Sequence, residues 1–310
     1  MKKINATVWF RGNYGPDEVQ GAYPCWPNDH FNWIPGRTSS EDKYAEHYKN
    51  GSSGYGEEKY LEIWNDDCTQ PWFEESVRKS NAKYKVMVLM EPRKLCPHNY
   101  EWVLNNHHLF DYVFTTYPDL NNVDKKYRYY HGGCRSYIRP EERGIHNKSK
   151  SLVCIMSWKT EMPGHILRHQ IRQWIETNST SNNPFSSRID YLNPPMDDKI
   201  AGLRDYRFEL VIENEVDSFF SEKLVDSMVS GCVPVYWTND NDTVLDIFDQ
   251  DGIIKFKDGN EFLAMLDNNI FTEELYLSKM EAIKNNIKIA EKYTSFGNVL
   301  WESGLKEIIK

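Results

Sequence analysis

Residues 208–237, FELVIENEVDSFFSEKLVDSMVSGCVPVYW, predict the architecture of this chain more clearly than any other stretch. The apolar run at 208–212 is long enough for a buried strand. A helix is expected to begin near Asp217 or Ser218, because both residue types favour the N-cap position. The apolar residues of this helix lie four apart on one face: Phe220, Leu224 and Met228. With a second strand at 233–237, the stretch is interpreted as one βαβ unit.

Four polar residues follow the first strand of this unit or open its helix: Glu213, Asn214, Glu222 and Lys223. Open parallel sheets bind ligands at the carboxyl ends of their strands. Helix N-termini favour phosphate there through their unpaired N–H groups and their dipole. Lys223 adds a positive charge for phosphate, and the Glu222 carboxylate can accept hydrogen bonds from ribose hydroxyls. The pattern therefore predicts a site for a phosphate-bearing ligand.

The same segment resembles the donor-binding signature of the α-1,3/4-fucosyltransferases, glycosyltransferase family 10. Three pieces carry the likeness in the family's order: Ile212-Glu213-Asn214, Phe219-Phe220-Ser221-Glu222-Lys223 and Gly231-Cys-Val-Pro-Val-Tyr-Trp237. Phe219 stands where the family has tyrosine, and Ser221 stands where it has threonine. The resemblance implies an enzyme of the soluble microbial or viral type that binds a nucleotide sugar.

Strands alternate with helices along the second half of the chain, which predicts a parallel sheet with right-handed crossovers. The strands are expected at 151–156, 188–191, 208–212, 233–237 and 253–256, and helices at 162–177 and near 242–248. One long amphipathic helix is expected from Thr272, with a short helix after it. The first half is less regular. Strands are expected there at 4–10, 84–90 and 112–116 with a helix at 98–106, and residues 12–81 are interpreted as loops and short helices.

The polar segment 143–149 is interpreted as the boundary between two α/β halves. These halves match the GT-B architecture that the resemblance implies, with two Rossmann-like, doubly wound domains facing a cleft. Residues 1–147 are then expected to form the acceptor-side domain with the catalytic base. Residues 148–310 are expected to form the nucleotide-sugar donor-binding domain, with the last helix packing back on the first domain.

An inverting glycosyl transfer needs a base for the acceptor hydroxyl and stabilisation of the leaving diphosphate. Glu91 is the candidate base, because it ends the predicted strand 84–90 in the segment Met90-Glu-Pro-Arg93. The segment resembles the family's Glu-Ser-Pro, whose glutamate is the proposed base. From the residues alone, the alternative is a surface glutamate where a strand meets a loop.

Arg168 is the second candidate for the diphosphate, after Lys223. It lies early in the predicted helix 162–177, and arginine is suited to bidentate phosphate contact. The family places a phosphate-binding arginine after a similar strand end. The residues alone leave Lys159, Arg172 and a solvent-facing Arg168 as alternatives.

Composition argues against several classes of protein. The formal net charge of −9 does not provide the basic surface of a general nucleic-acid binder. No apolar run approaches the roughly 20 residues of a membrane helix, and the N-terminus lacks the features of a signal peptide. A soluble, cytoplasmic protein is expected, in the host cytoplasm if the source is viral.

The sequence also gives no reason to expect a metal. None of the six cysteines forms a CxxC pair, and Cys154 and Cys232 are expected to be buried thiols. The acidic segments 65–67 and 239–242 are interpreted as turns, where Asn and Asp are common. No metal site and no required cofactor are predicted, although Mn²⁺ or Mg²⁺ could stimulate the reaction.

The resemblance implies a fucosyltransferase-like enzyme that moves L-fucose from GDP-fucose to a hydroxyl of a glycan acceptor with inversion, as in glycan biosynthesis or protein glycosylation. Glu91 would be the base, Arg168 and Lys223 would hold the diphosphate, and Glu222 the ribose. Glu213 and Asn214 would border the donor sugar. Two alternatives are transfer of another nucleotide-activated sugar, and a catalytically silent nucleotide- or glycan-binding protein.

Overall fold

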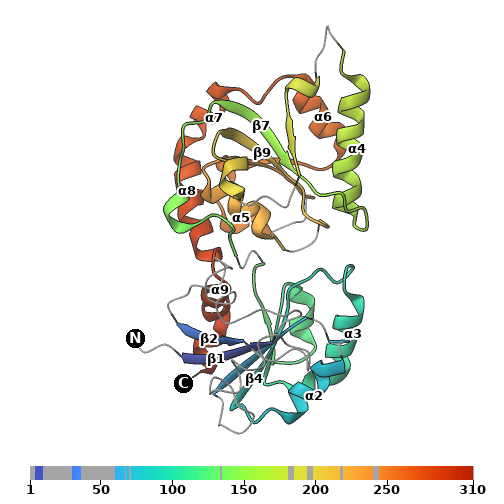
Figure 1. Cartoon of the computed structure of the whole chain (residues 1–310), viewed down its shortest axis with the longest axis vertical. Helices are drawn as coiled ribbons and strands as arrows, with labels where there is room; N and C mark the ends of the chain where they lie inside the picture. Colours follow the sequence, from blue (N-terminus) through green and yellow to red (C-terminus); the bar gives the residue numbers. More distant parts are fainter. Residues whose placement is uncertain are drawn as a thin grey trace. The chain divides into compact units, whose positions relative to one another are not determined.

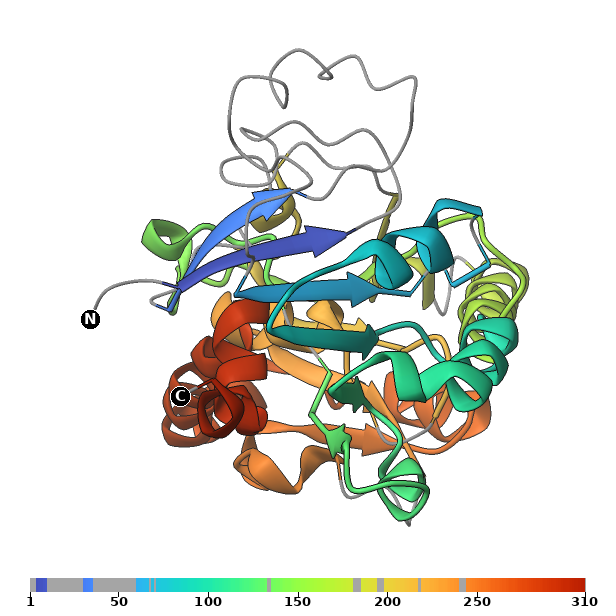
Figure 2. The same cartoon turned by 90° about the horizontal axis from the view of Figure 1, so that it is seen from below.

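The structure of the chain is a computed structural model (Figures 1 and 2). It describes residues 4–9, 30–35, 60–66, 68–69, 71–132, 135–180, 185–193, 198–216, 219–239 and 244–309. The chain divides into two compact units, the first formed by Met1–Gly132 with Ser295–Lys310 and the second by Gly133–Thr294. Segment 143–149 lies within the second unit, where Gly144 N donates to Val229 O.

The first unit is built on a parallel sheet of six strands, in the order β2-β1-β3-β4-β5-β6. The strands are β1 (Ile4–Trp9), β2 (Phe31–Pro35), β3 (Leu61–Asn65), β4 (Tyr84–Leu89), β5 (Tyr112–Thr115) and β6 (Tyr127–Tyr129). The helices among its described residues are α2 (Pro71–Lys79), α3 (Pro97–Asn106), α9 (Phe296–Leu300) and α10 (Lys306–Ile308). Figure 2 shows the strands running in one direction.

One face of this sheet forms a core with α2 and α3. The buried side chains come from β3, β4, β5 and the two helices: Trp64, Met87, Leu89, Val113, Phe73, Val77, Tyr100 and Val103. Trp64 satisfies its indole N–H inside this core by donating to Ser76 Oγ at 2.8 Å. The first unit is therefore an α/β layer structure, as predicted.

The interpretation of residues 12–81 as loops and short helices is wrong for part of that segment. It contains the strands β2 and β3, and β3 is a central strand that pairs with β1 and β4, whereas the short helix α2 agrees with the interpretation. The sequence of β3, LEIWN, has a glutamate in place of a second apolar residue. Glu62 breaks the continuous apolar run that marks a buried parallel strand. Its side chain is nevertheless only 1% exposed.

The second unit has a parallel sheet of five strands, in the order β11-β10-β9-β7-β8. The strands are β7 (Lys150–Ile155), β8 (Asp190–Leu192), β9 (Tyr206–Val211), β10 (Val233–Trp237) and β11 (Ile254–Phe256). The helices are α4 (Pro163–Asn178), α5 (Glu222–Val229), α6 (Gly259–Asp267), α7 (Glu273–Ser278) and α8 (Met280–Ala290). The strand order reverses between β7 and β9, which defines the switch point of a doubly wound sheet.

Helices cover both faces of the second sheet (Figure 1). On one face, β9 contributes Phe208 and Leu210 to a cluster with α4 and α6. On the other face, Val211 packs with Leu224 and Met228 of α5. This alternation explains why β9 is apolar along most of its length, as strands buried on both faces are.

The prediction of one long helix from Thr272 is wrong. Thr272 caps a short helix, α7, which ends at Ser278, and α8 follows after Lys279. Lys279 has φ −96° and ψ 6°, outside the helical region, so the two helices are separate. Nor does the helix expected near 242–248 form as a full helix. The described part of that segment contains one 3₁₀ turn, Val244–Ile247.

Candidate functional site

The N-terminus of α5 lies later in the chain than predicted. Helix α5 begins at Glu222, and Ser221 is its N-cap, with Oγ accepting from Lys223 N at 3.2 Å. Asp217 and Ser218, the predicted starting points, lie outside the described residues. The Glu213 carboxylate accepts from both Ser221 N and Ser221 Oγ at 2.7 Å. These two bonds hold Ser221 in an extended conformation, so the helix cannot start before it.

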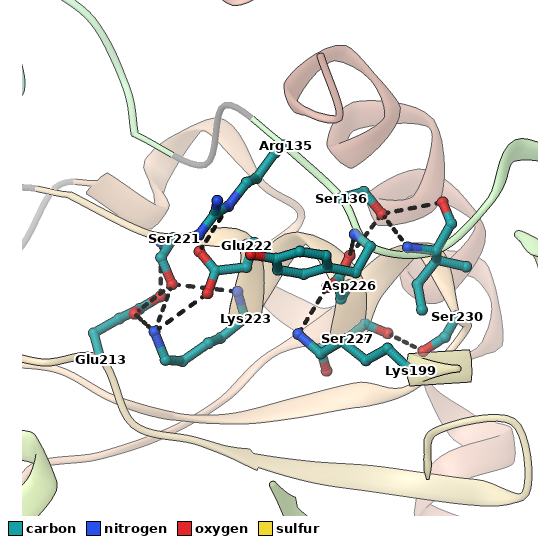
Figure 3. Close-up of polar contacts among 12 residues, drawn as sticks. Arg135, Ser136, Lys199, Glu213, Ser221, Glu222, Lys223, Asp226, Ser227 and Ser230 are labelled. Atoms are coloured by element: carbon teal, nitrogen blue, oxygen red, sulfur yellow. Dashed lines mark hydrogen bonds and ion pairs between the residues drawn. The ribbon is translucent and has the colours of Figure 1, made fainter. Parts of the chain in front are cut away.

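Glu213 joins the end of β9 to the first turn of α5 (Figure 3). Its side chain is only 1% exposed, and Lys223 Nζ lies 3.3 Å from its Oε2 atom. Lys223 Nζ also donates to Ser221 Oγ at 3.0 Å. A buried carboxylate needs such partners, because burial disfavours its charge. One-quarter of the Lys223 side chain remains exposed, while Glu213 and Ser221 anchor its ammonium group.

Glu222 lies between two cations (Figure 3). Its Oε2 atom is 3.7 Å from Arg135 Nε, and its Oε1 atom is 3.7 Å from Lys223 Nζ. Burial raises the pKa of Glu222, but the positive charges of Lys223, Arg135 and Lys199 outweigh burial and hold the pKa well below its usual range. Glu222 is therefore an ionised hydrogen-bond acceptor at neutral pH.

Arg135 is a member of this site that the sequence did not reveal. It lies in the segment that precedes β7, outside every motif, and its guanidinium lies 4.9 Å from the ring centroid of Tyr137. The neighbouring Ser136 Oγ donates to Asp226 Oδ1 at 2.6 Å, and Tyr137 N donates to the same oxygen at 3.0 Å. Asp226 is fully buried on α5. The hydrogen bonds to Asp226 fix the two residues that follow Arg135, and Arg135 thereby lies beside Glu222.

Helix α4 brings Arg168 to the same edge of the sheet. Gly164 N donates to Asn214 O at 2.9 Å, and a Cβ atom at Gly164 would lie 1.7 Å from Glu213 O. Only glycine allows α4 to approach so closely. Arg168 Nε then donates to Gly164 O at 3.1 Å, and Nη2 donates to Asn214 Oδ1 at 3.4 Å.

His165 shapes the start of α4 as a neutral group. Its Nδ1 atom accepts from Met162 N at 3.3 Å. Burial and the nearby charge of Arg168 lower the pKa of His165, which fits an unprotonated Nδ1.

The two other candidates for phosphate binding, Lys159 and Arg172, have surroundings that differ from those of Arg168. Lys159 is exposed, and Arg172 Nε donates to Glu176 at 2.8 Å while its guanidinium lies over Trp158.

The structure thus brings the predicted donor-binding residues of the second unit together at the carboxyl ends of β7 and β9. We call this group the switch-point cluster, which consists of Arg135, Arg168, Glu213, Asn214, Ser221, Glu222 and Lys223. It combines three cations with two carboxylates beside the first turns of two helices. Such a site can bind an anion through charge and N–H groups, and hydroxyl groups through Glu222.

Glu91 belongs to the first unit, where it follows β4 and its side chain is exposed. Its N–H donates to Asp66 Oδ2 at 3.2 Å, and its carbonyl accepts from Tyr100 Oη at 2.8 Å. The backbone that carries Glu91 is therefore held on both sides. The base role of this residue remains a prediction.

Within the described part of the chain, no group of three or more His, Cys, Asp or Glu side chains is placed to hold a metal ion. Segment 239–242 lies outside the described residues except for Asn239.

Cys154 and Cys232 are buried, as predicted, and both are free thiols, as are Cys68 and Cys96. No described helix has the length and apolar character needed to cross a membrane.

No protein-family model and no curated protein matches the chain. Solved structures do match it. A sucrose-phosphate synthase from Thermosynechococcus elongatus is 10% identical, with 99% of each chain covered and a TM-score of 0.59. Anabaena HepE in complex with UDP-glucose is 10% identical over 98% of this chain and 99% of that chain, with a TM-score of 0.54. An α1,3-fucosyltransferase with GDP is 12% identical over 94% of this chain and 90% of that chain, with a TM-score of 0.52. These neighbours are GT-B glycosyltransferases, and the predicted GT-B fold is confirmed.

Proposed function

We propose that the chain is a glycosyltransferase that binds a nucleotide-diphosphate sugar at the switch-point cluster. The observation that carries this proposal is the junction of α4 and α5 through Glu213 and Asn214, which gathers Arg168 and Lys223 at one sheet edge, where Arg135 also pairs with Glu222. Ligands of doubly wound sheets bind at this point. Solved GT-B enzymes with the same fold are described with GDP and with UDP-glucose, which supports a nucleotide-sugar donor here.

GDP-fucose is the donor that we propose within this class. The pieces 212–214, 219–223 and 231–237 resemble the fucosyltransferase signature, and a matching solved structure is an α1,3-fucosyltransferase with GDP. The ionised Glu222 would accept hydrogen bonds from the ribose hydroxyls, and Asn214 and Glu213 would border the sugar. The second candidate donor is a UDP-sugar, because Anabaena HepE shares the fold and is described with UDP-glucose.

The proposed reaction is an inverting transfer with Glu91 as the base. Glu91 would take the proton of an acceptor hydroxyl on a glycan. The hydroxyl oxygen would attack the anomeric carbon as the bond to the diphosphate oxygen breaks. Arg168 and Lys223 would stabilise the negative charge of the leaving diphosphate. This division of roles places acceptor activation in the first unit and donor binding in the second.

A panel of nucleotides and nucleotide sugars tests the donor class by thermal unfolding. A ligand at 100 times its Kd adds about 2.7 kcal/mol to the free energy of unfolding. We expect GDP and GDP-fucose to raise Tm and UDP and UDP-glucose to leave it unchanged. Stabilisation by UDP alone would favour the second candidate donor. An unchanged Tm with every nucleotide would contradict the proposed class, and nucleotide binding without any transfer would favour a silent binding protein.

A further inference from the structure

A residue with strained backbone follows β3 in the first unit. Asp66 has a φ of 41°, in the left-handed region that favours glycine. Among the described residues other than glycine, it shares a positive φ only with Asn269. Backbone strain of this kind persists where surrounding contacts over-determine the conformation, and it is concentrated at functional sites.

The Asp66 carboxylate binds the backbone at the end of β4. Its Oδ1 and Oδ2 atoms each lie 3.2 Å from Met90 N, and Oδ2 lies 3.2 Å from Glu91 N. Its own N–H donates to Val88 O at 3.1 Å, so Asp66 links the carboxyl ends of two neighbouring strands. Glycine would adopt this backbone without strain, but it could not accept the two N–H groups. The carboxylate explains why a residue with a side chain occupies the position.

Two tyrosines form hydrogen bonds with the loop that follows β4 and carries Glu91. Tyr100 Oη donates to Glu91 O at 2.8 Å, and Tyr117 Oη accepts from Arg93 N at 2.9 Å. Burial, with the charge of Asp66 adding to it, raises the pKa of Tyr100, so its hydroxyl keeps the proton that it donates. The Arg93 guanidinium lies 4.3 Å from the ring centroid of Tyr117. Glu91 has an exposed side chain on a backbone that is fixed at its N–H and at its carbonyl.

We propose that Asp66 is a positioning residue for the proposed base Glu91, an inference that rests on the proposed function. A general base must stay within hydrogen-bond reach of the hydroxyl that it deprotonates. A misplacement of about 1 Å can lower the rate on the order of 10²-fold. Asp66 sets the direction in which the Glu91 side chain leaves the backbone, because it holds the N–H of that residue and of the residue before it. Asp66 itself need not touch substrate.

Three substitutions separate this role from a general effect on folding. Asp66→Gly relieves the strain and removes the carboxylate, and we expect kcat to fall about 10- to 100-fold with an unchanged Kd for GDP. Asp66→Asn keeps one acceptor oxygen and adopts positive φ as Asp does, so its kcat should lie between those of Asp66→Gly and the wild type. Asn269→Gly is the matched control in the second unit, and its kcat should equal that of the wild type. A wild-type kcat in Asp66→Gly would overturn the proposal.

A double-mutant cycle with Glu91→Gln identifies the residue through which Asp66 acts. If Asp66 acts through Glu91, Asp66→Gly should cause no further loss of kcat in the Glu91→Gln background. Additive losses would overturn the proposal. Amide hydrogen exchange gives a readout that does not depend on turnover. Faster exchange at Met90 and Glu91 in Asp66→Gly supports the proposal, and unchanged exchange overturns it. Wild-type turnover in Glu91→Gln alone would overturn the proposed function instead.

Discussion

The switch-point cluster in the second unit and the loop around Glu91 in the first unit are built in different ways. Glu213, Ser221 and Lys223 lie close together in the sequence, and their hydrogen bonds form within one βαβ unit. The backbone of Glu91 is held by Asp66, which follows β3, and by Tyr100, which lies in α3. The part of the switch-point cluster that comes from one continuous segment leaves a motif in the sequence, whereas Arg135 and Arg168 come from other segments. A site made from separate segments leaves single residues that no pattern connects.

The largest expected effect separates chemistry from donor binding. Glu91→Gln keeps the shape of the side chain but cannot accept the proton, so kcat should fall by about 10² to 10⁴. The Kd for GDP should not change, because the donor-binding residues belong to the other unit. Steady-state kinetics and calorimetry on the same variant measure both quantities. Near-normal kcat, or loss of GDP binding, would contradict the separation of roles.

The next effect concerns a buried acid in the second unit. Burial raises the pKa of Glu209 to about 7, although Lys199 and Ser227 oppose the increase. The folded state therefore binds this proton more tightly than the unfolded state, and the free energy of unfolding should fall as pH rises from about 4.5 to 7. Glu209→Gln lacks this titration and should gain up to about 3 kcal/mol relative to the wild type over that range. Urea unfolding of both proteins at pH 4.5 and pH 8 measures the gain. Equal pH dependence of the two proteins would show that Glu209 ionises normally.

Lys223→Ala should weaken donor binding by a smaller amount. It removes a charge-assisted contact worth roughly 1.5 to 3 kcal/mol, so the Kd for GDP should rise at least about tenfold. Lys159→Ala is the matched control, because Lys159 is an exposed lysine of the same unit. Its Kd should equal that of the wild type. Unchanged GDP binding in Lys223→Ala, measured by calorimetry, would remove Lys223 from the site.

Chelation should have the smallest effect. The proposed diphosphate clamp uses Arg168, Lys223 and helix N-termini, so transfer should continue in excess EDTA even if Mn²⁺ or Mg²⁺ raises the rate. The initial rate with and without EDTA measures this directly. Complete and reversible loss of activity on chelation, together with the same loss in Asp240→Ala or Asp242→Ala, would mean that segment 239–242 holds a required metal.

The sequence predicted the second unit well because its strands alternate regularly with helices and its central strands are rich in apolar residues. Strands β7, β9 and β10 and helix α4 lie within a residue or two of their expected positions. The same reasoning missed β3, because Glu62 interrupts its short apolar pattern and no regular alternation of strands and helices was expected around it. It also placed the start of α5 too early, because Asp217 and Ser218 are good N-cap types. Local propensity could not reveal that Glu213 would hold Ser221 extended.

The candidate site could be predicted where a motif carried it. Glu213, Asn214, Glu222 and Lys223 come from one segment, and the structure brings Arg168 to them through Gly164. Arg135 could not be found, because its contact with Glu222 depends on the anchoring of Ser136 by Asp226. Asp66 was interpreted as a turn residue, and its bonds to the loop that carries Glu91 appear only in three dimensions.

The most direct test of the central claim is transfer from GDP-fucose to a panel of glycan acceptors, with the anomeric configuration of the product determined by NMR. We expect one GDP released for each sugar transferred and a product whose anomeric configuration is inverted relative to the donor. We also expect Arg168→Ala to weaken GDP binding in the same assay mixture. Transfer with retained configuration, or no transfer from any nucleotide sugar despite binding, would contradict an inverting glycosyltransferase.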